Sequence, residues 1–128
     1  MIKIFLVDDH DIVRAGIKRI LEDLKGVTVA GEASTGEDAV VWCRQHQCDI
    51  VLMDMNLPGI DGIEATKRVL RANPDARVIM LTVQSNDPIP SQVMKAGQAL
   101  KGKIWKILKQ FHSTVMNGER QQQTQSSE

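Results

Sequence analysis

Four short runs of apolar residues recur along the chain, and each is nearly continuous instead of alternating with polar residues. They are IKIFLV (2–7), VTVAGEA (27–33), DIVLMD (49–54) and ARVIMLT (76–82). Alternation is typical of a strand with one face in water, whereas a continuous run is typical of a strand buried on both faces. These runs therefore predict four strands of a parallel sheet.

Between the runs, apolar residues recur every three or four positions, which is the spacing of one helix face. Two sets show this spacing: Val13, Ile17, Ile20, Leu21 and Leu24, and then Ile63, Thr66, Val69 and Leu70. They predict a helix over 12–24 and another that begins after Gly62. A third, shorter helix is predicted over 36–46 (GEDAVVWCRQH), where Ser34 or Thr35 can cap the first turn.

Strands that alternate with helices in this way form a parallel sheet with right-handed crossovers and helices on both faces. Such sheets bind ligands beyond the carboxyl ends of their strands, where the strand order reverses. Asp8 and Asp9 follow the first predicted strand, and Asp54 ends the third. If these two strands are neighbours, three carboxylates meet at one edge of the sheet.

Three carboxylates held close together repel one another, and a bound cation removes this conflict. Mg²⁺ takes oxygen ligands and is commonly held by one or two carboxylates together with phosphate oxygens. An aspartate oxygen can also attack phosphorus and carry the group as an acyl phosphate. The pattern therefore favours a site for Mg²⁺ and a phosphoryl group. The simpler interpretation is that Asp9 or Asp11 only stabilises the start of the helix over 12–24.

Composition and charge exclude several classes of protein. The 128 residues suit one domain, and 16 Lys and Arg balance 16 Asp and Glu. Residues 1–97 hold 11 basic against 14 acidic residues, and residues 98–128 hold 5 against 2, so no strong overall field indicates binding to nucleic acid or membrane. No apolar run approaches the roughly 20 residues of a membrane span, and the start lacks the features of a signal peptide. The expected location is the cytoplasm.

Cysteine and histidine offer no ready metal centre in the sequence. Cys43 and Cys48 have four residues between them and no second cluster at ligand spacing, so we expect reduced thiols. The three histidines are scattered along the chain, at His10, His46 and His112. A three-histidine metal site is therefore the weaker interpretation.

Four motifs follow one another over three quarters of the chain. They are FLVDDHDIVRAGIKRIL, GEASTGEDAV, DIVLMDMNLPGIDGIEAT and VIMLTV. With them, residues 1–97 resemble the receiver domain of bacterial two-component response regulators and, including the tract VMKAG (93–97), the GacA/UvrY group of the NarL/FixJ subfamily. The resemblance implies a flavodoxin-like (CheY-like), doubly wound parallel sheet and phosphotransfer from the histidine of a sensor kinase to Asp54.

The resemblance also implies roles for single residues. Asp9, Asp54 and the backbone carbonyl of Asn56 are expected to bind Mg²⁺, with Asp8 assisting through water. Thr82 is the expected switch residue, whose hydroxyl contacts a phosphoryl oxygen on Asp54. These roles are expectations that come from the family.

The resemblance ends after Gly97. Family members continue with a fifth strand of the form A-G-Y-L-T-K, which carries a switch aromatic residue and a lysine, whereas this chain continues GQALKGKIWKILK and contains no Tyr. Ile104 stands where the lysine is expected, Lys101 fits only after a deletion, and Lys103 is one step out of register. We therefore assign the catalytic lysine to no residue and expect a fifth strand that is degenerate or missing.

The predicted domain organisation follows from this break. Residues 1–97 are predicted to form a receiver domain that is incomplete at its C-terminal side. Residues 98–118 form a divergent segment with an amphipathic basic helix that docks on the core, with a partner-seeking or DNA-contacting helix as the alternatives. Residues 119–128 are a disordered polar tail. No DNA-binding output domain is expected in this chain, which a frameshift, a truncation or a single-domain receiver would explain.

The predicted function is a phosphoaccepting receiver module of transcription regulation, with Mg²⁺ as cofactor and a sensor histidine kinase as partner, and not an enzyme. The alternative is a degenerate or truncated receiver that acts as a phosphorylation-independent interaction module. A third interpretation, a Mg²⁺-dependent aspartyl-phosphate hydrolase, needs a DxD nucleophile after the first strand, where this chain has DDHD (8–11). An uncovered edge of strand 76–82 would favour a homodimer. Direct nucleic-acid binding and membrane binding are not expected.

Overall fold

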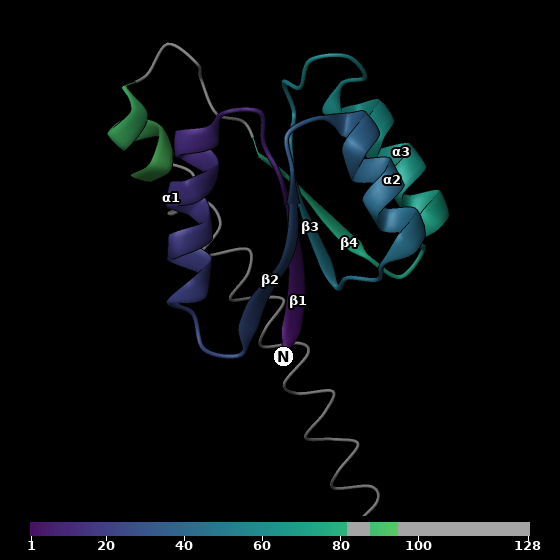
Figure 1. Cartoon of the computed structure of the whole chain (residues 1–128), viewed down its shortest axis with the longest axis horizontal. Coiled ribbons are helices and arrows are strands. Elements are labelled where there is room, and N and C mark those ends of the chain that lie inside the picture. Colours follow the sequence, from purple (N-terminus) through teal and green to yellow (C-terminus); the bar gives the residue numbers. More distant parts are fainter. Residues whose placement is uncertain (82–87, 95–128) are drawn as a thin grey trace, which may run out of the picture. The chain divides into compact units, whose positions relative to one another are not determined.

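The computed structural model describes residues 1–81 and 88–94. In chain order, they contain β1 (Ile2–Val7), α1 (Asp11–Glu22), β2 (Val27–Ala33), α2 (Gly36–Gln45), β3 (Ile50–Asp54), α3 (Gly62–Ala72) and β4 (Arg77–Leu81), followed by helical residues 89–94. Strands and helices alternate, and Figure 1 shows α1 on one side of the sheet and α2 and α3 on the other.

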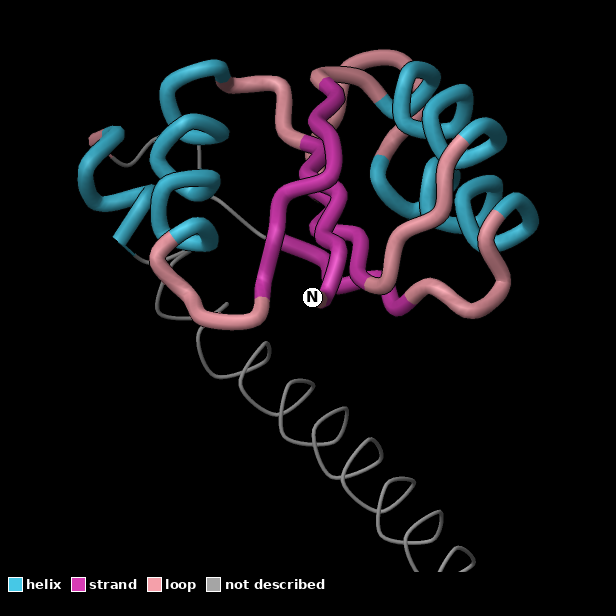
Figure 2. Tube along the Cα trace, turned by 60° about the horizontal axis from the view of Figure 1, so that its bottom comes forward, coloured by secondary structure: helices cyan, strands magenta, loops and turns pink. Residues whose placement is uncertain are grey.

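The four described strands form one parallel sheet in the order β2-β1-β3-β4. β1 lies between β2 and β3, so the strand order reverses beside β1. Figure 2 shows the strands as a layer with helices on either side. The pairing of β1 with β3 runs from Ile4 opposite Ile50 to Val7 opposite Met53. The prediction of a flavodoxin-like, doubly wound parallel sheet is confirmed. The position predicted for the fifth strand lies outside the described residues.

The sheet is buried on both faces, as continuous apolar runs predict. Successive side chains of a strand point to opposite faces, so β1 contributes Phe5 and Val7 to the core beneath α2 and α3, and Ile4 to the opposite core. Phe5 stacks on Trp42 of α2, with ring centroids 4.1 Å apart. On the opposite face, the buried side chains of α1 are Val13, Ile17 and Leu21. Burial of each large aliphatic side chain contributes about 1.5–3 kcal/mol to folding.

α1 and α2 begin and end within two residues of their predicted bounds, and α3 begins one residue earlier than predicted. Thr35 caps α2, because its Oγ1 accepts a backbone N–H of the first turn at 3.1 Å. α1 begins at Asp11, one residue earlier than predicted, and ends at Glu22, two residues earlier. It ends early because the chain must turn at Gly26, with φ of +81°, so that the carbonyl of Gly26 can accept the N–H of Ile2 at 2.7 Å.

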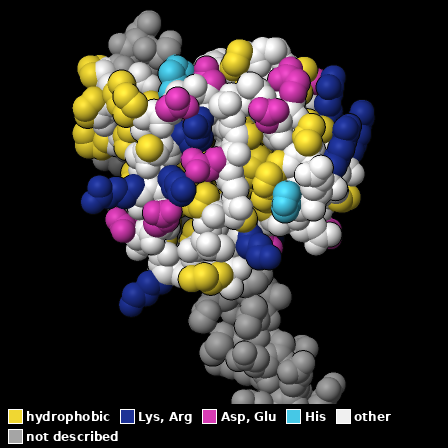
Figure 3. Space-filling view, in the orientation of Figure 1, with side chains coloured by type: hydrophobic (Ala, Val, Ile, Leu, Met, Phe, Trp, Pro, Cys, Tyr) yellow, Lys and Arg dark blue, Asp and Glu magenta, His cyan; other side chains and the backbone are white. Residues whose placement is uncertain are grey.

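Helical residues 89–94 lie against α1. The side chain of Val93 fills the space that a Cβ atom at Gly16 would need, with its nearest carbons 3.0 Å from that position. Figure 3 shows apolar side chains gathered over this part of the molecule, where Ile12 and Met94 are exposed. Elsewhere on the face shown, Lys and Arg lie interspersed with Asp and Glu, in keeping with the balanced charge.

The described residues leave several predictions from the sequence untested. The amphipathic helix over 98–118 and the tail over 119–128 lie outside the described residues. β4 is an edge strand of the described sheet, so the predicted homodimer at this edge stays a prediction. Within 1–81 and 88–94, no helix has the length and apolar character needed to cross a membrane.

Candidate functional site

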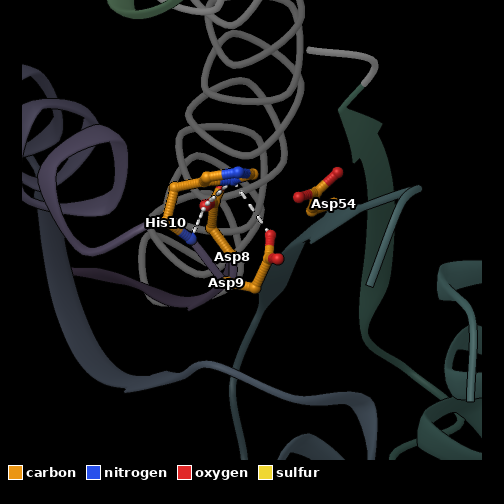
Figure 4. Close-up of side chains that lie close together, drawn as sticks. All are labelled: Asp8, Asp9, His10 and Asp54. Carbon is orange, nitrogen blue, oxygen red and sulfur yellow. Dashed lines mark hydrogen bonds and ion pairs between the residues drawn. The ribbon is translucent and has the colours of Figure 1, made fainter. Parts of the chain in front are cut away.

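The carboxyl ends of β1 and β3 bring three aspartates together. Asp8 and Asp9 follow β1 directly, and Asp54 is the last residue of β3. Because the two strands pair in parallel up to their ends, these side chains leave the sheet next to each other. Together with His10 they form the acidic cluster shown in Figure 4, in which one ligand atom from each of the four residues lies within 4.8 Å of the others.

Backbone contacts hold Asp54 in place. Its Oδ1 accepts the backbone N–H of Asn56 at 3.0 Å, and the N–H of Met55 donates to the carbonyl of Leu81 in β4 at 3.0 Å. α3 begins against the same residue, because a Cβ atom at Gly62 would collide with the backbone oxygen of Asp54. Only glycine allows this close approach of helix to strand.

The loop between β3 and α3 is fixed by contacts on both sides. Gly59 adopts φ of +75° and turns the chain back toward the sheet. The N–H of Ile60 then donates to Oε1 of Glu37 at 2.9 Å, and this bond lowers the pKa of Glu37. Asp61 caps α3 by accepting the N–H of Glu64 at 2.8 Å. These contacts fix the conformation of the segment that follows Asp54.

Asp8 is fully buried, and His10 contacts its carboxylate twice. The backbone N–H of His10 donates to Oδ1 of Asp8 at 2.7 Å, and Nδ1 of its ring lies 3.6 Å from that oxygen and 3.0 Å from Oδ1 of Asp9. Arg14 of α1 donates to the backbone carbonyl of Asp8 at 2.7 Å, so it holds the turn and not the carboxylate. Oδ2 of Asp8 is buried and accepts no hydrogen bond from the described residues.

Burial and repulsion between carboxylates oppose ionisation of Asp54 and Asp8. The pKa of Asp54 is raised to about 6, mainly by burial and further by the carboxylates of Asp8 and Asp9, against the opposing hydrogen bond from Asn56. Burial also raises the pKa of Asp8. At neutral pH the site therefore holds buried negative charges close together, which is energetically unfavourable. A bound cation would offset these charges.

The residues present fit Mg²⁺. Carboxylate oxygens are the ligands this ion prefers, and opposite ligands at about 2.1 Å from it stand about 4.2 Å apart. The 4.8 Å spread of the cluster atoms is close to that span. The buried Oδ2 of Asp8, which lacks a donor among the described residues, is a further position that a cation or its water would satisfy.

The structure brings together the three carboxylates that the sequence pattern predicted to meet. Asp8, Asp9 and Asp54 all lie in the cluster, and Asn56 is tied to Asp54 through its backbone N–H. Their individual roles in metal binding and phosphotransfer stay predictions. The expected switch residue and both lysines considered for the catalytic role lie outside the described residues: Thr82, Lys101 and Lys103.

His10 is the cluster residue that reasoning from the sequence missed. Sequence spacing groups it with His46 and His112, although its place directly after two strand-end aspartates is the available signal. The simpler interpretation, in which Asp9 or Asp11 stabilises the start of the helix, fits the position of Asp11, whereas the N-cap residue of α1 is His10, whose side chain makes no cap bond. Asp11 lies in the first turn and pairs with Arg14 at 2.9 Å.

Comparison with known proteins identifies the family. The response regulator receiver domain family matches residues 4–111. The response regulator UvrY of Escherichia coli (strain K12) is 60% identical over 99 residues, which cover 77% of this chain and 45% of UvrY. The response regulator GacA of Pseudomonas aeruginosa is 50% identical over 99 residues, covering 77% of this chain and 46% of GacA. The chain thus spans less than half the length of these relatives.

A solved structure agrees with the sequence relatives. The crystal structure of a two-component response regulator of the LuxR family from Aurantimonas sp. SI85-9A1 has a TM-score of 0.61 at 38% identity, with 74% of this chain and 68% of that chain covered. The resemblance to response regulator receivers and to the GacA/UvrY group is confirmed. This chain therefore belongs to the response regulator receiver domain family of two-component systems.

Proposed function

We propose that this chain accepts a phosphoryl group on Asp54 from a sensor histidine kinase, with Mg²⁺ bound at the acidic cluster, and that it does so in the cytoplasm. It acts as a switch that is modified once per cycle, and not as an enzyme that turns over an external substrate. The observation that carries the proposal is the meeting of Asp54 with Asp8 and Asp9 at the ends of the neighbouring strands β1 and β3.

The residues of the acidic cluster have different roles in this proposal. Asp54 is the nucleophile, because its carboxylate is oriented by the N–H of Asn56 and stands at the end of a rigid, fully buried strand. Asp9 and Asp54 would hold Mg²⁺ directly, with the Asn56 carbonyl, while Asp8 would act through water. When bound, the ion offsets the charge of the carboxylates and of the incoming phosphoryl oxygens.

The transfer proposed for Asp54 balances without a further reactant. A carboxylate oxygen forms a bond to phosphorus as the nitrogen–phosphorus bond of the kinase phosphohistidine breaks, and the bonding electrons stay on the imidazole nitrogen. The product is an acyl phosphate on Asp54. Water later cleaves this bond and restores the carboxylate.

The test is direct detection of the modified residue. The chain is incubated with Mg²⁺ and a small acyl phosphate donor, the acyl phosphate is trapped by borohydride reduction, and peptide mass spectrometry locates the change. We expect the mark on Asp54 in the presence of Mg²⁺ and none when a chelator is present. Reduction at Asp8 or Asp9 in place of Asp54 would contradict the assignment.

Metal affinity should depend on Asp9 far more than on its neighbour Asp11. Asp9→Ala removes a carboxylate from the cluster, so calorimetry should show Mg²⁺ binding weakened by at least about tenfold. Asp11→Ala is the matched control, because its side chain is 85% exposed and pairs with Arg14. Equal losses in both variants would remove Asp9 from the metal site.

The alternative function, an interaction module that no longer responds to phosphorylation, rests on the missing family lysine and switch aromatic. Because a phosphoryl group adds about two negative charges, and a ligand shifts a conformational equilibrium only by its differential affinity, we expect a weak response in this chain. Hydrogen exchange of residues 82–97, with and without a beryllofluoride mimic, measures it. Strong new protection there would show that the switch is intact.

A further inference from the structure

His10 lies where a metal ligand would lie. It is the N-cap residue of α1, its backbone N–H bonds to Oδ1 of Asp8, and Nδ1 of its ring lies 3.6 Å from the same oxygen. Nδ1 is 3.0 Å from Oδ1 of Asp9, and Figure 4 shows the ring facing the space bounded by Asp8, Asp9 and Asp54. The side chain of His10 is half-exposed, so the ring borders solvent.

We propose that His10 is a fourth ligand of the acidic cluster and gives the site a preference for a transition metal, zinc above all, over Mg²⁺. This inference rests on the metal-binding part of the proposed function. Imidazole nitrogen suits Zn²⁺ and other late divalent metals, whereas Mg²⁺ takes oxygen ligands almost without exception. One imidazole with two or three carboxylates is a complete zinc donor set, and zinc accepts nitrogen and carboxylate oxygen at about 2.0–2.2 Å.

The burial and charge of the cluster support a ligand role for this histidine. The buried Oδ2 of Asp8 needs a positively charged or hydrogen-bonding partner, and Arg14 is directed at the backbone carbonyl of that residue instead. Zinc at the cluster would satisfy this oxygen and would turn the Asp9–His10 contact into a shared bond to the metal. The four donor atoms already lie within 4.8 Å of one another, so movements of less than about an ångström bring them to one ion.

An ion pair between His10 and Asp9 is the competing explanation, and it makes the opposite prediction. If the ring only neutralises Asp9, its removal leaves the carboxylate freer to bind any cation, so metal affinity stays the same or rises. If the ring is a ligand, its removal weakens zinc and spares Mg²⁺. The ratio of the two affinities therefore separates the explanations.

The experiment compares His10→Gln with the wild-type chain and with His46→Gln. His46 is the matched control, because it lies at the end of α2, remote from the cluster, and stacks on Trp42. Zinc and Mg²⁺ binding are measured by calorimetry in weakly alkaline buffer, where zinc binds the neutral imidazole. Zinc taken up by Cys43 and Cys48 cancels in the comparison, because every variant contains both thiols.

We expect His10→Gln to weaken zinc binding by at least about tenfold, since even a partner of a metal ligand contributes about 10- to 100-fold to affinity. Mg²⁺ binding should change by less than about threefold, because it relies on oxygen ligands. Pulsed electron paramagnetic resonance of Mn²⁺ bound at the cluster should show coupling to an imidazole nitrogen in the wild type and in His46→Gln, and none in His10→Gln. Unchanged zinc affinity, or absence of nitrogen coupling in the wild type, would overturn the inference.

The outcome is independent of phosphotransfer. A zinc affinity that depends on His10 supports the inference even if Asp54 accepts no phosphoryl group, in which case only the proposed function fails. Conversely, phosphorylated Asp54 with zinc affinity unaffected by His10→Gln overturns the inference and leaves the proposed function standing.

Discussion

Asp54→Asn should abolish phosphorylation of the chain by a small acyl phosphate donor. The amide keeps the shape of the side chain but has no ionised oxygen to attack phosphorus, so the trapped label should fall by at least about a hundredfold. Phosphate-affinity electrophoresis or mass spectrometry of the intact chain measures the fraction modified. The loss should be complete at every Mg²⁺ concentration, because it arises from the nucleophile and not from weaker metal binding.

The matched control is Asp49→Asn, because Asp49 directly precedes the first residue of β3, whereas Asp54 is the last. Asp49 is exposed and accepts the backbone N–H of Lys3 at 2.8 Å, about the length of β3 away from the cluster. This variant should be labelled like the wild type. A label that persists in Asp54→Asn would mean that another carboxylate is the acceptor, and peptide mapping would identify it.

Asp54→Asn should also stabilise the chain against unfolding when metal is absent. A rise in pKa from 3.8 to about 6 corresponds to about 3 kcal/mol of differential interaction between the two protonation states. Because the folded-state pKa is above the unfolded value, the contribution of Asp54 to stability is fully present below about pH 4 and is lost as the pH rises through about 6. Asparagine carries no such penalty, so its advantage in free energy of unfolding should approach 1–3 kcal/mol, roughly, above pH 7.

Denaturant unfolding followed by circular dichroism, in a chelating buffer, measures this difference. The advantage of Asp54→Asn should shrink as the pH falls toward 4, and Mg²⁺ should stabilise the wild type but not the variant. Asp49→Asn should show no comparable gain, because its carboxylate is exposed. An advantage that is the same at both ends of the pH range would show that the buried charge of Asp54 is not its cause.

The strands were predictable because a strand that is buried on both faces is a nearly continuous run of apolar residues. All five residues of β3 are buried, and its apolar run ends at the residue where the strand ends. β2 is an edge strand and is only partly buried, so its run includes Gly31 and Glu32. The order of the strands cannot be read from such local patterns. The pairing of β1 with β3 could only be assumed, because it depends on contacts between residues far apart in the sequence.

The carboxylates of the site were predictable once the strands were, because neighbouring parallel strands place their final residues at one edge of the sheet. His10 was not, because its contact with Asp9 depends on the turn between β1 and α1. In that turn the N–H of residue 10 bonds back to Asp8 and the ring contacts Asp9, an arrangement that no periodicity of the sequence indicates. A histidine after two strand-end aspartates can be assigned to the site only when the conformation of the turn is known.

The central place of β1 in the sheet has a consequence for the nascent chain. β1 is synthesised before β2, β3 and β4, yet one of its edges has no partner until β3 has left the ribosome, and this pairing joins residues 4 and 50 across a long stretch of sequence. All four residues of the acidic cluster lie within the first 54 residues. The docking of β3 is therefore the event that both completes the pairing of β1 and gathers the negative charge. A divalent cation that relieves this repulsion favours the folding of the emerging chain as well as the stability of the finished domain.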